Sequence, residues 1–160
     1  MTFSRKRKNR EFIPILIQVE LYLQRKNQFF GKLQELLKYT DMLMLDIKHI
    51  DDEQHKILTG QSNKNILEFA RYLSDIKKPI WIRHVLVPER SDKDEYLERL
   101  HDFIETLDNV ERVEVLPYHT LGAYKWKELG YDYKLEGIDP PTPERIENAN
   151  RILETAKYLK

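Results

Sequence analysis

The sequence predicts an α/β fold built from three parallel strands, each followed by a helix. Short apolar runs of strand length stand at residues 42–45, 79–87 and 110–116. Between and after them, apolar residues recur at the spacing of a helix that packs on one side. Strands that alternate with helices favour a parallel sheet, because parallel neighbours need a long crossover connection.

The first strand–helix unit begins after residue 29. The strand at residues 42–45 ends at Asp46, and Asn63 is a suitable N-cap for the helix that follows,. A helix ahead of the strand is predicted from leucines at helical spacing: Leu33, Leu36 and Leu37,. The inward face of the helix after the strand is predicted to consist of Ile66, Phe69, Ala70 and Leu73.

The second and third units follow the same order. Residues 79–87 form the second predicted strand, and Ser91 is expected to cap the next helix with Asp94 at the capping-box position,. Residues 110–116 form the third strand with imperfect alternation, and Thr142, followed by proline, opens the last helix,. The inward faces of these two helices are predicted to be Leu97, Leu100, Ile104 and Leu107, then Ile146, Ala149, Leu153 and Ala156.

The strands are nearly continuous in apolar character, which fits burial on both faces of the sheet. Three units are compatible with a small open sheet or with part of a barrel. In both architectures functional sites lie at the carboxyl ends of the strands. Those ends are polar in this sequence and comprise residues 46–48, 87–90 and 117–119.

Composition narrows the possible partners. The chain has 160 residues, enough for one domain, and its 27 basic residues balance 27 acidic ones, so we expect neither nucleic acid nor a membrane as partner,. The sequence contains no cysteine, which excludes disulfides and thiolate-held metals or clusters and favours the cytoplasm,. Residues 1–29 form a separate basic and apolar segment, whereas residues 30–160 carry the strand–helix rhythm.

Polar residues at the predicted strand ends are candidate binding groups. Asp46 and Lys48 share one face of a strand end, where they could hold a polar cofactor or simply pair with each other. His119 could bind a ligand or fix its loop, and Arg83 needs an anionic partner such as Asp46 or a substrate. His101 is expected on a solvated helix face. Aromatic residues expected to serve packing are Trp81, Tyr118, Tyr124 and Trp126.

Residues 30 to about 155 resemble the second half of the pyruvate formate-lyase activating enzymes, over about four fifths of the chain. The order and spacing of short matching runs carry the resemblance. These runs lie at residues 39–48, 58–60, 65–70, 81–88, 116–119, 125–126, 135–137 and 140–142.

The resemblance implies a partial (βα)6 barrel, of which this chain would form the carboxyl-terminal half. Enzymes of the family hold a 4Fe-4S cluster by a CxxxCxxC motif and cleave S-adenosylmethionine, and the resulting radical takes hydrogen from a glycine of pyruvate formate-lyase. By position, Asp46, Lys48 and His119 resemble residues of the S-adenosylmethionine pocket. Asp46 with the backbone of Met44 resembles a monovalent-cation site, and Arg83 resembles an arginine that contacts the glycine-bearing peptide.

The sequence departs from the family in three respects, one of which is the absence of the glycine-rich strand that binds the methionine amino group in the family. The cluster motif is absent, so no cluster is expected in this chain and the chain alone is expected to be inactive. Glu89 stands where the family has glycine, so the local turn is expected to differ. One hypothesis is that residues 1–29 are translated out of frame.

Three alternative functions remain open from the sequence. The chain could be a non-catalytic remnant that binds the lyase. It could be a companion subunit to a separately encoded amino-terminal half. It could also be an unrelated small α/β enzyme that uses Asp46, Lys48 and His119.

Overall fold

The computed structural model describes residues 28–159, apart from the side chains of residues 28–30 and 127. Strands β1 (Leu43–Asp46), β2 (Ile80–Leu86) and β3 (Val110–Pro117) form a parallel sheet in the order β1-β2-β3. The helical elements are α2 (Gln28–Lys38), α3 (Asp52–Thr59), α4 (Lys64–Asp75), α5 (Asp94–Glu105), η1 (Thr120–Gly122), α6 (Ala123–Glu128), α7 (Pro143–Ile152) and η2 (Thr155–Tyr158). The predicted α/β class and the parallel order are confirmed.

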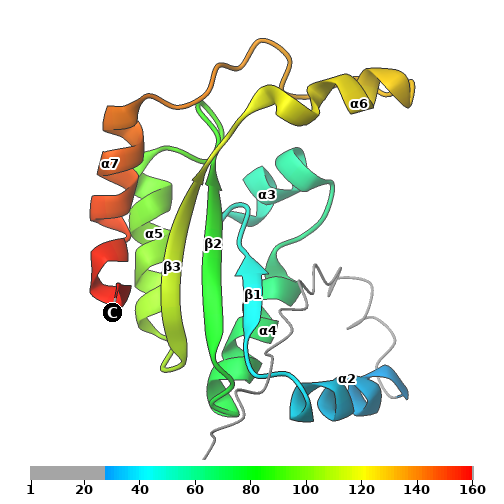
Figure 1. Cartoon of the computed structure of the whole chain (residues 1–160), viewed down its shortest axis with the longest axis vertical. Coiled ribbons are helices and arrows are strands. Elements are labelled where there is room, and N and C mark those ends of the chain that lie inside the picture. Colours follow the sequence, from blue (N-terminus) through cyan, green and yellow to red (C-terminus); the bar gives the residue numbers. More distant parts are fainter. Residues whose placement is uncertain (1–27, 160) are drawn as a thin grey trace, which may run out of the picture.

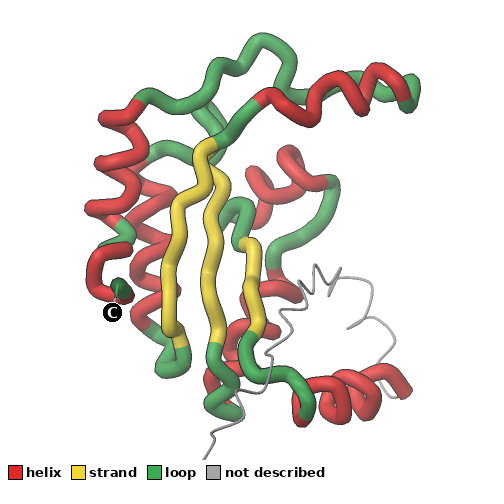
Figure 2. The backbone as a smooth tube through the Cα atoms, viewed as in Figure 1, coloured by secondary structure: helices red, strands yellow, loops and turns green. Residues whose placement is uncertain are grey.

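The sheet is covered by helices on one face only. Helices α4 and α5 pack behind the strands, with α7 beside α5, and no described helix lies in front of them (Figures 1 and 2). Along β2, every second residue is buried and the residues between them are half-buried. The prediction of burial on both faces was therefore wrong for the described residues. Apolar side chains such as Trp81 and Val85 made the run look continuous, although they lie on the uncovered face.

The core lies between the sheet and the helices. The predicted inward faces of α4 and α5 are buried throughout, because their apolar residues recur at the helical period,. In the other two helical regions the prediction holds for Leu33, Leu37, Ala149 and Leu153, whereas Leu36 and Ala156 are exposed. No helix within residues 28–159 is both long and apolar enough to cross a membrane.

One of the three predicted helix caps is formed. Thr142 accepts a hydrogen bond from the first turn of α7. Asn63 precedes α4, but its side-chain amide donates to backbone carbonyls ahead of α3. Ser91 is buried, where its hydroxyl donates to the carbonyl of Val85 and accepts from the backbone N–H of Val87. These two side chains stabilise loops at the carboxyl ends of the strands.

The imperfect alternation in the third strand has a structural cause. Val110 pairs with Ile80, and Arg112 pairs with the next residue, Trp81, so that Glu111 has no partner in β2. The irregularity restores the alternation from Arg112 onward, which places Glu114 on the uncovered face,.

Candidate functional site

The carboxyl ends of β1 and β2 meet in a cluster of three charged side chains. Arg83 stands opposite Asp46 in the strand register, and its Nε donates to Asp46 Oδ1 at 2.7 Å. Lys48 Nζ donates to the other carboxylate oxygen, Oδ2, at 2.9 Å. The Asp46 side chain is only 16% exposed, so these two cations compensate its negative charge where water cannot,. The predicted proximity of Asp46 and Lys48 is confirmed, and Arg83 has Asp46 as its anionic partner.

The same uncovered face carries a second polar contact, which joins two residues of β3. Arg112 donates to Glu114 at 3.1 Å, and its guanidinium lies 4.9 Å from the centre of the Trp81 ring. Glu114 stands opposite Arg83, so charges of alternating sign follow one another across the strands. Such a face can bind a polar ligand, since Lys48 and Arg83 offer donors and the carboxylates offer acceptors.

His119 lies apart from this cluster. It is exposed at the turn between β3 and η1, and its ring makes no hydrogen bond within residues 28–159. His119 therefore makes no hydrogen bond with Asp46 or Lys48, although all three residues lie near the carboxyl ends of the strands. The expectation that a hydrogen bond of His119 fixes its loop was wrong for the described residues.

A buried histidine that the sequence analysis did not single out supports the cluster from behind. His84 Nδ1 lies 2.8 Å from the carbonyl oxygen of Ile47, and Nε2 lies 3.2 Å from the carbonyl oxygen of Ser91. Ile47 separates Asp46 from Lys48, so His84 ties the charged segment to the loop after β2. Burial lowers the pKa of His84 below its usual range,. Alternate residues of a strand face the same side, so the expected burial of Ile82 could have indicated that His84 is buried as well,.

His49 forms a second buried contact at this edge. Its Nδ1 accepts from the backbone N–H of Asp51 at 3.0 Å, and its Nε2 lies 3.2 Å from the carbonyl oxygen of Arg90. Burial lowers the pKa of His49 as well. The ring thus joins the loop after β1 to the loop after β2, which fixes both sides of the charged cluster.

The outer edge of β1 is open among the described residues. The backbone N–H of Leu43 donates to the carbonyl of Pro79, just ahead of β2, at 3.1 Å, and that of Ile47 donates to the carbonyl of Arg83 at 3.0 Å. Because the backbone groups of alternate residues point in opposite directions, those of Met44 and Asp46 face the unpaired edge. The Met44 carbonyl is therefore available to a ligand or to another strand.

Glu89 adopts the left-handed conformation that a glycine would favour, with φ at +63°. The turn after β2 therefore has a positive φ at a glutamate, and its expected difference from the family's turn stays a prediction. A side chain in this region carries a strain of roughly 1–2 kcal/mol.

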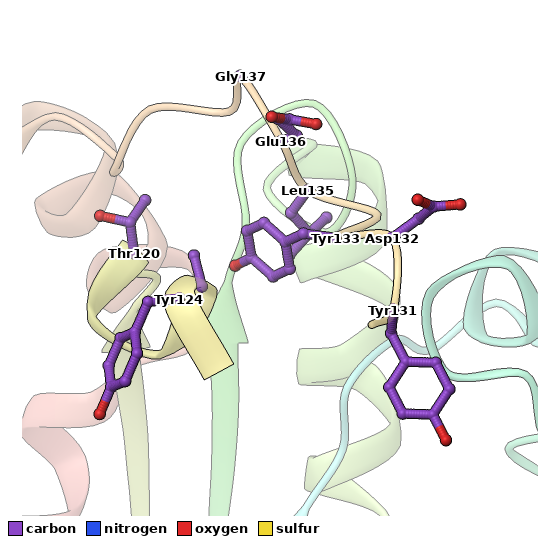
Figure 3. Close-up of a pocket in the computed structure, with 9 residues that line it drawn as sticks. Thr120, Tyr124, Tyr131, Asp132, Tyr133, Leu135, Glu136 and Gly137 are labelled. Atoms are coloured by element: carbon purple, nitrogen blue, oxygen red, sulfur yellow. The ribbon is translucent and has the colours of Figure 1, made fainter. Parts of the chain in front are cut away.

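An aromatic segment follows His119 and rises beyond the sheet (Figure 1). Residues 120–137 line an open pocket of about 450 Å³ in which Tyr133 points inward (Figure 3). The hydroxyls of Tyr133 and Tyr118 lie 2.6 Å apart, and burial together with this contact raises the pKa of Tyr133 to about 12. Tyr118 is buried as expected. Tyr124 and Trp126 are exposed, although the Trp126 ring packs against Tyr131 and Tyr133 of the same segment, with ring centroids 6.4 and 6.0 Å apart.

Curated relatives align with most of the chain. The pyruvate formate-lyase-activating enzyme of Streptococcus mutans is 55% identical over 131 residues, which are 82% of this chain and 50% of that protein. The enzyme of the same name from Listeria monocytogenes is 54% identical over 134 residues, 84% of this chain and 54% of that protein. The chain thus spans about half the length of these relatives. No family model matches the sequence.

Solved structures share the fold. A domain of a pyruvate-formate lyase-activating enzyme from Bacteroides vulgatus aligns with 80% of this chain and 69% of its own, with a TM-score of 0.64 and 20% identity. A radical SAM methyltransferase from Sphaerobacter thermophilus aligns with 78% of this chain and 34% of its own, with a TM-score of 0.54 and 17% identity. The chain therefore shares its fold with both of these solved structures. The matched part of the chain belongs to the pyruvate formate-lyase-activating enzyme family.

Proposed function

We propose that this chain is the carboxyl-terminal part of an activating enzyme for pyruvate formate-lyase, and that its uncovered sheet face binds S-adenosylmethionine. The observation that carries the proposal is the cluster of Lys48, Asp46 and Arg83 at the carboxyl ends of β1 and β2. These groups lie on the face that no described helix covers. A ligand with a carboxylate, an amine and hydroxyl groups suits donors and acceptors placed this close together.

Each residue of the cluster has a separate part in this proposal. Lys48 is the most exposed of the three, at 37%, so it can turn from Asp46 toward a ligand carboxylate or hydroxyl. Asp46 accepts hydrogen bonds from ligand hydroxyls, and His119 lines the adenosyl end from the loop after β3. In an active enzyme these residues would hold S-adenosylmethionine, which would supply the group that removes hydrogen from the lyase glycine.

Arg83 orients the protein substrate in this proposal. Its Nε is engaged by Asp46, while its terminal nitrogens have no ion pair within residues 28–159. A guanidinium presents five N–H donors, so the remaining ones can bind backbone carbonyls of the glycine-bearing segment. Asp46 would thus hold Arg83 in place beside the bound cofactor.

We also propose the monovalent-cation site that the resemblance implies at Asp46 and the Met44 backbone. The carbonyl of Met44 faces the open edge of β1, two residues before Asp46. A cation at this edge would compete with Lys48 and Arg83 for the Asp46 carboxylate, because both oxygens already accept a hydrogen bond.

The 4Fe-4S cluster of the family does not fit this chain. Its usual ligands are cysteine thiolates, and the sequence has no cysteine,. We therefore derive no step through a cluster. We infer that this chain alone does not activate the lyase, and that the cluster ligands of an active enzyme come from residues outside this chain.

Binding of S-adenosylmethionine to the full chain tests the proposal by isothermal titration calorimetry. Lys48→Met should weaken binding about tenfold, the value of one charge-assisted hydrogen bond of roughly 1.4 kcal/mol. Lys77→Met is the matched control, since Lys77 forms an exposed ion pair with Asp108 near the amino ends of β2 and β3. Absence of saturable binding, or equal affinities for the wild type and Lys48→Met, would refute the assignment.

A further inference from the structure

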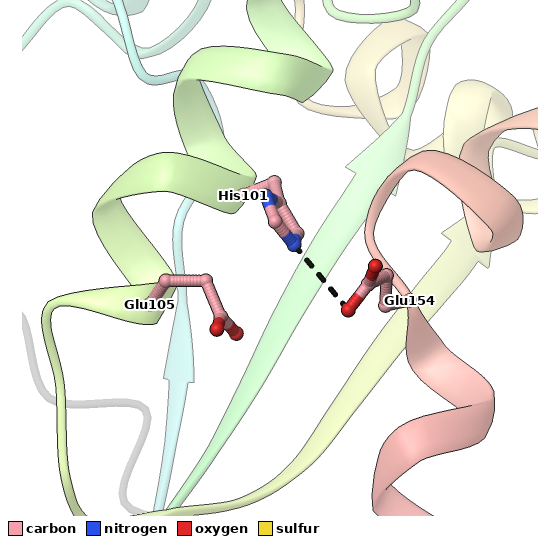
Figure 4. Close-up of side chains that lie close together, drawn as sticks. All are labelled: His101, Glu105 and Glu154. Atoms are coloured by element: carbon pink, nitrogen blue, oxygen red, sulfur yellow. Dashed lines mark ion pairs between the residues drawn. The ribbon is translucent and has the colours of Figure 1, made fainter.

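A second cluster of ionisable side chains lies on the helical side of the molecule. His101 and Glu105 come from α5, and Glu154 follows the end of α7 (Figure 4). His101 was expected on a solvated face, yet its side chain is only 24% exposed because the carboxyl-terminal segment packs beside it. Helix α5, which carries His101 and Glu105, lies on the covered side of the sheet, opposite the proposed S-adenosylmethionine face (Figure 1).

The three side chains are arranged as metal ligands are. His101 and Glu105 are four residues apart on α5, so they share one face of the helix. One nitrogen or oxygen from each of the three residues lies within 4.8 Å of the others. Ligand atoms around one tetrahedral zinc ion are about 3.4 Å apart, so small side-chain rotations would bring them to an ion.

Two further observations point to a cation at this place. His101 Nε2 is buried without a hydrogen-bond partner among the described residues, and it faces Glu154 Oε2 at 3.6 Å. A buried nitrogen without a partner costs free energy that a metal bond would recover. Glu105 already holds a cation, since Lys157 Nζ donates to both of its carboxylate oxygens at 2.7 and 2.8 Å.

We propose that His101, Glu105 and Glu154 form a binding site for a divalent transition metal, with Zn²⁺ as the ion that one imidazole and two carboxylates suit best. Water completes the coordination. Lys157 competes with the metal for Glu105, so metal binding displaces the lysine. The ion would join α5 to the segment after α7 and would stabilise the fold, independently of the function proposed above.

Zinc titration of the full chain in metal-free buffer tests this site by calorimetry and thermal unfolding. One zinc ion should bind per chain and raise the unfolding temperature. His101→Ala and Glu154→Gln should each weaken binding at least tenfold. Glu98→Gln is the matched control, because Glu98 is an exposed glutamate of the same helix outside the cluster. Unfolding without zinc shows whether each variant is folded.

Lys157→Met separates a metal site from a simple ion-pair network. Removing the competing ammonium frees Glu105, so this variant should bind zinc more tightly than the wild type. An ion-pair network without a metal function predicts no such gain. The proposal is overturned if the wild type shows no saturable zinc binding, if His101→Ala binds as the wild type does, or if Lys157→Met does not bind more tightly.

Discussion

Replacing Asp46 by asparagine should destabilise the chain, because it leaves two cations without their shared counter-charge. Hydrogen bonds to charged groups contribute roughly 1.5–3 kcal/mol each when protected from water. The bond to Arg83 Nε is short, at 2.7 Å, and both side chains are mostly buried, so it should contribute near the lower end of that range. Lys48 can turn to water, so its bond should contribute less than about 1 kcal/mol. Together we expect a loss of about 2 kcal/mol.

Urea unfolding followed by circular dichroism measures this loss. At a typical slope of about 2 kcal/mol per molar urea, the midpoint of Asp46→Asn should fall by about 1 M. Arg83→Met and the double variant complete a mutant cycle, in which the coupling free energy between Asp46 and Arg83 should be about 1–2 kcal/mol. Lys77→Met, which removes an exposed ion pair, should shift the midpoint only slightly,.

The reasoning is refuted by either of two results. If Asp46→Asn unfolds at the same urea concentration as the wild type, the carboxylate does not stabilise the strand ends. If the coupling free energy is near zero, the contact between Asp46 and Arg83 is incidental, and the proposed orientation of Arg83 loses its support.

Three further predictions concern the surroundings of the site. Glu89→Gly should stabilise the chain by about 0.5–1 kcal/mol in urea unfolding, since φ is +63° there, whereas Glu89→Ala should not,. Burial lowers the pKa of His84 below its ordinary 6.5, so on acidification the unfolded chain binds a proton at His84 more readily than the folded chain does. The urea midpoint should therefore fall as the pH drops below about 6.5, and His84→Asn should flatten this dependence. Leu73→Ala, at a fully buried position, should cost about 2–5 kcal/mol by the same assay,.

The order of elements was predictable because each one carries its own periodicity. The inward residues of α4 and α5 follow the helical repeat, and the structure buries them. The proximity of Asp46 and Lys48 was predictable for the same reason, since residues two apart in a strand share a face. These inferences need only local geometry.

Other features depend on contacts that the local sequence does not record. Serine is a common helix cap, but the hydroxyl of Ser91 donates to the carbonyl of Val85, and Lys93 occupies the N-cap position of α5. The uncovered face could not be recognised from strand composition, because Trp81 is apolar whether or not a helix covers it. The cluster proposed to bind zinc adds Glu154, from the far end of the chain, to His101 and Glu105 of α5, and no local spacing indicates that third residue.

The charged row across the strands also has a consequence for how the chain folds. Asp46, Arg83 and Glu114 stand opposite one another in neighbouring strands, with alternating sign. A slip of one residue in either pairing would turn that strand's charged side chain into the helix-covered layer, where an unpaired charge is costly. Parallel strands meet only after a long connection has closed, when several alignments compete. The row therefore disfavours misaligned sheets once the helices pack over them.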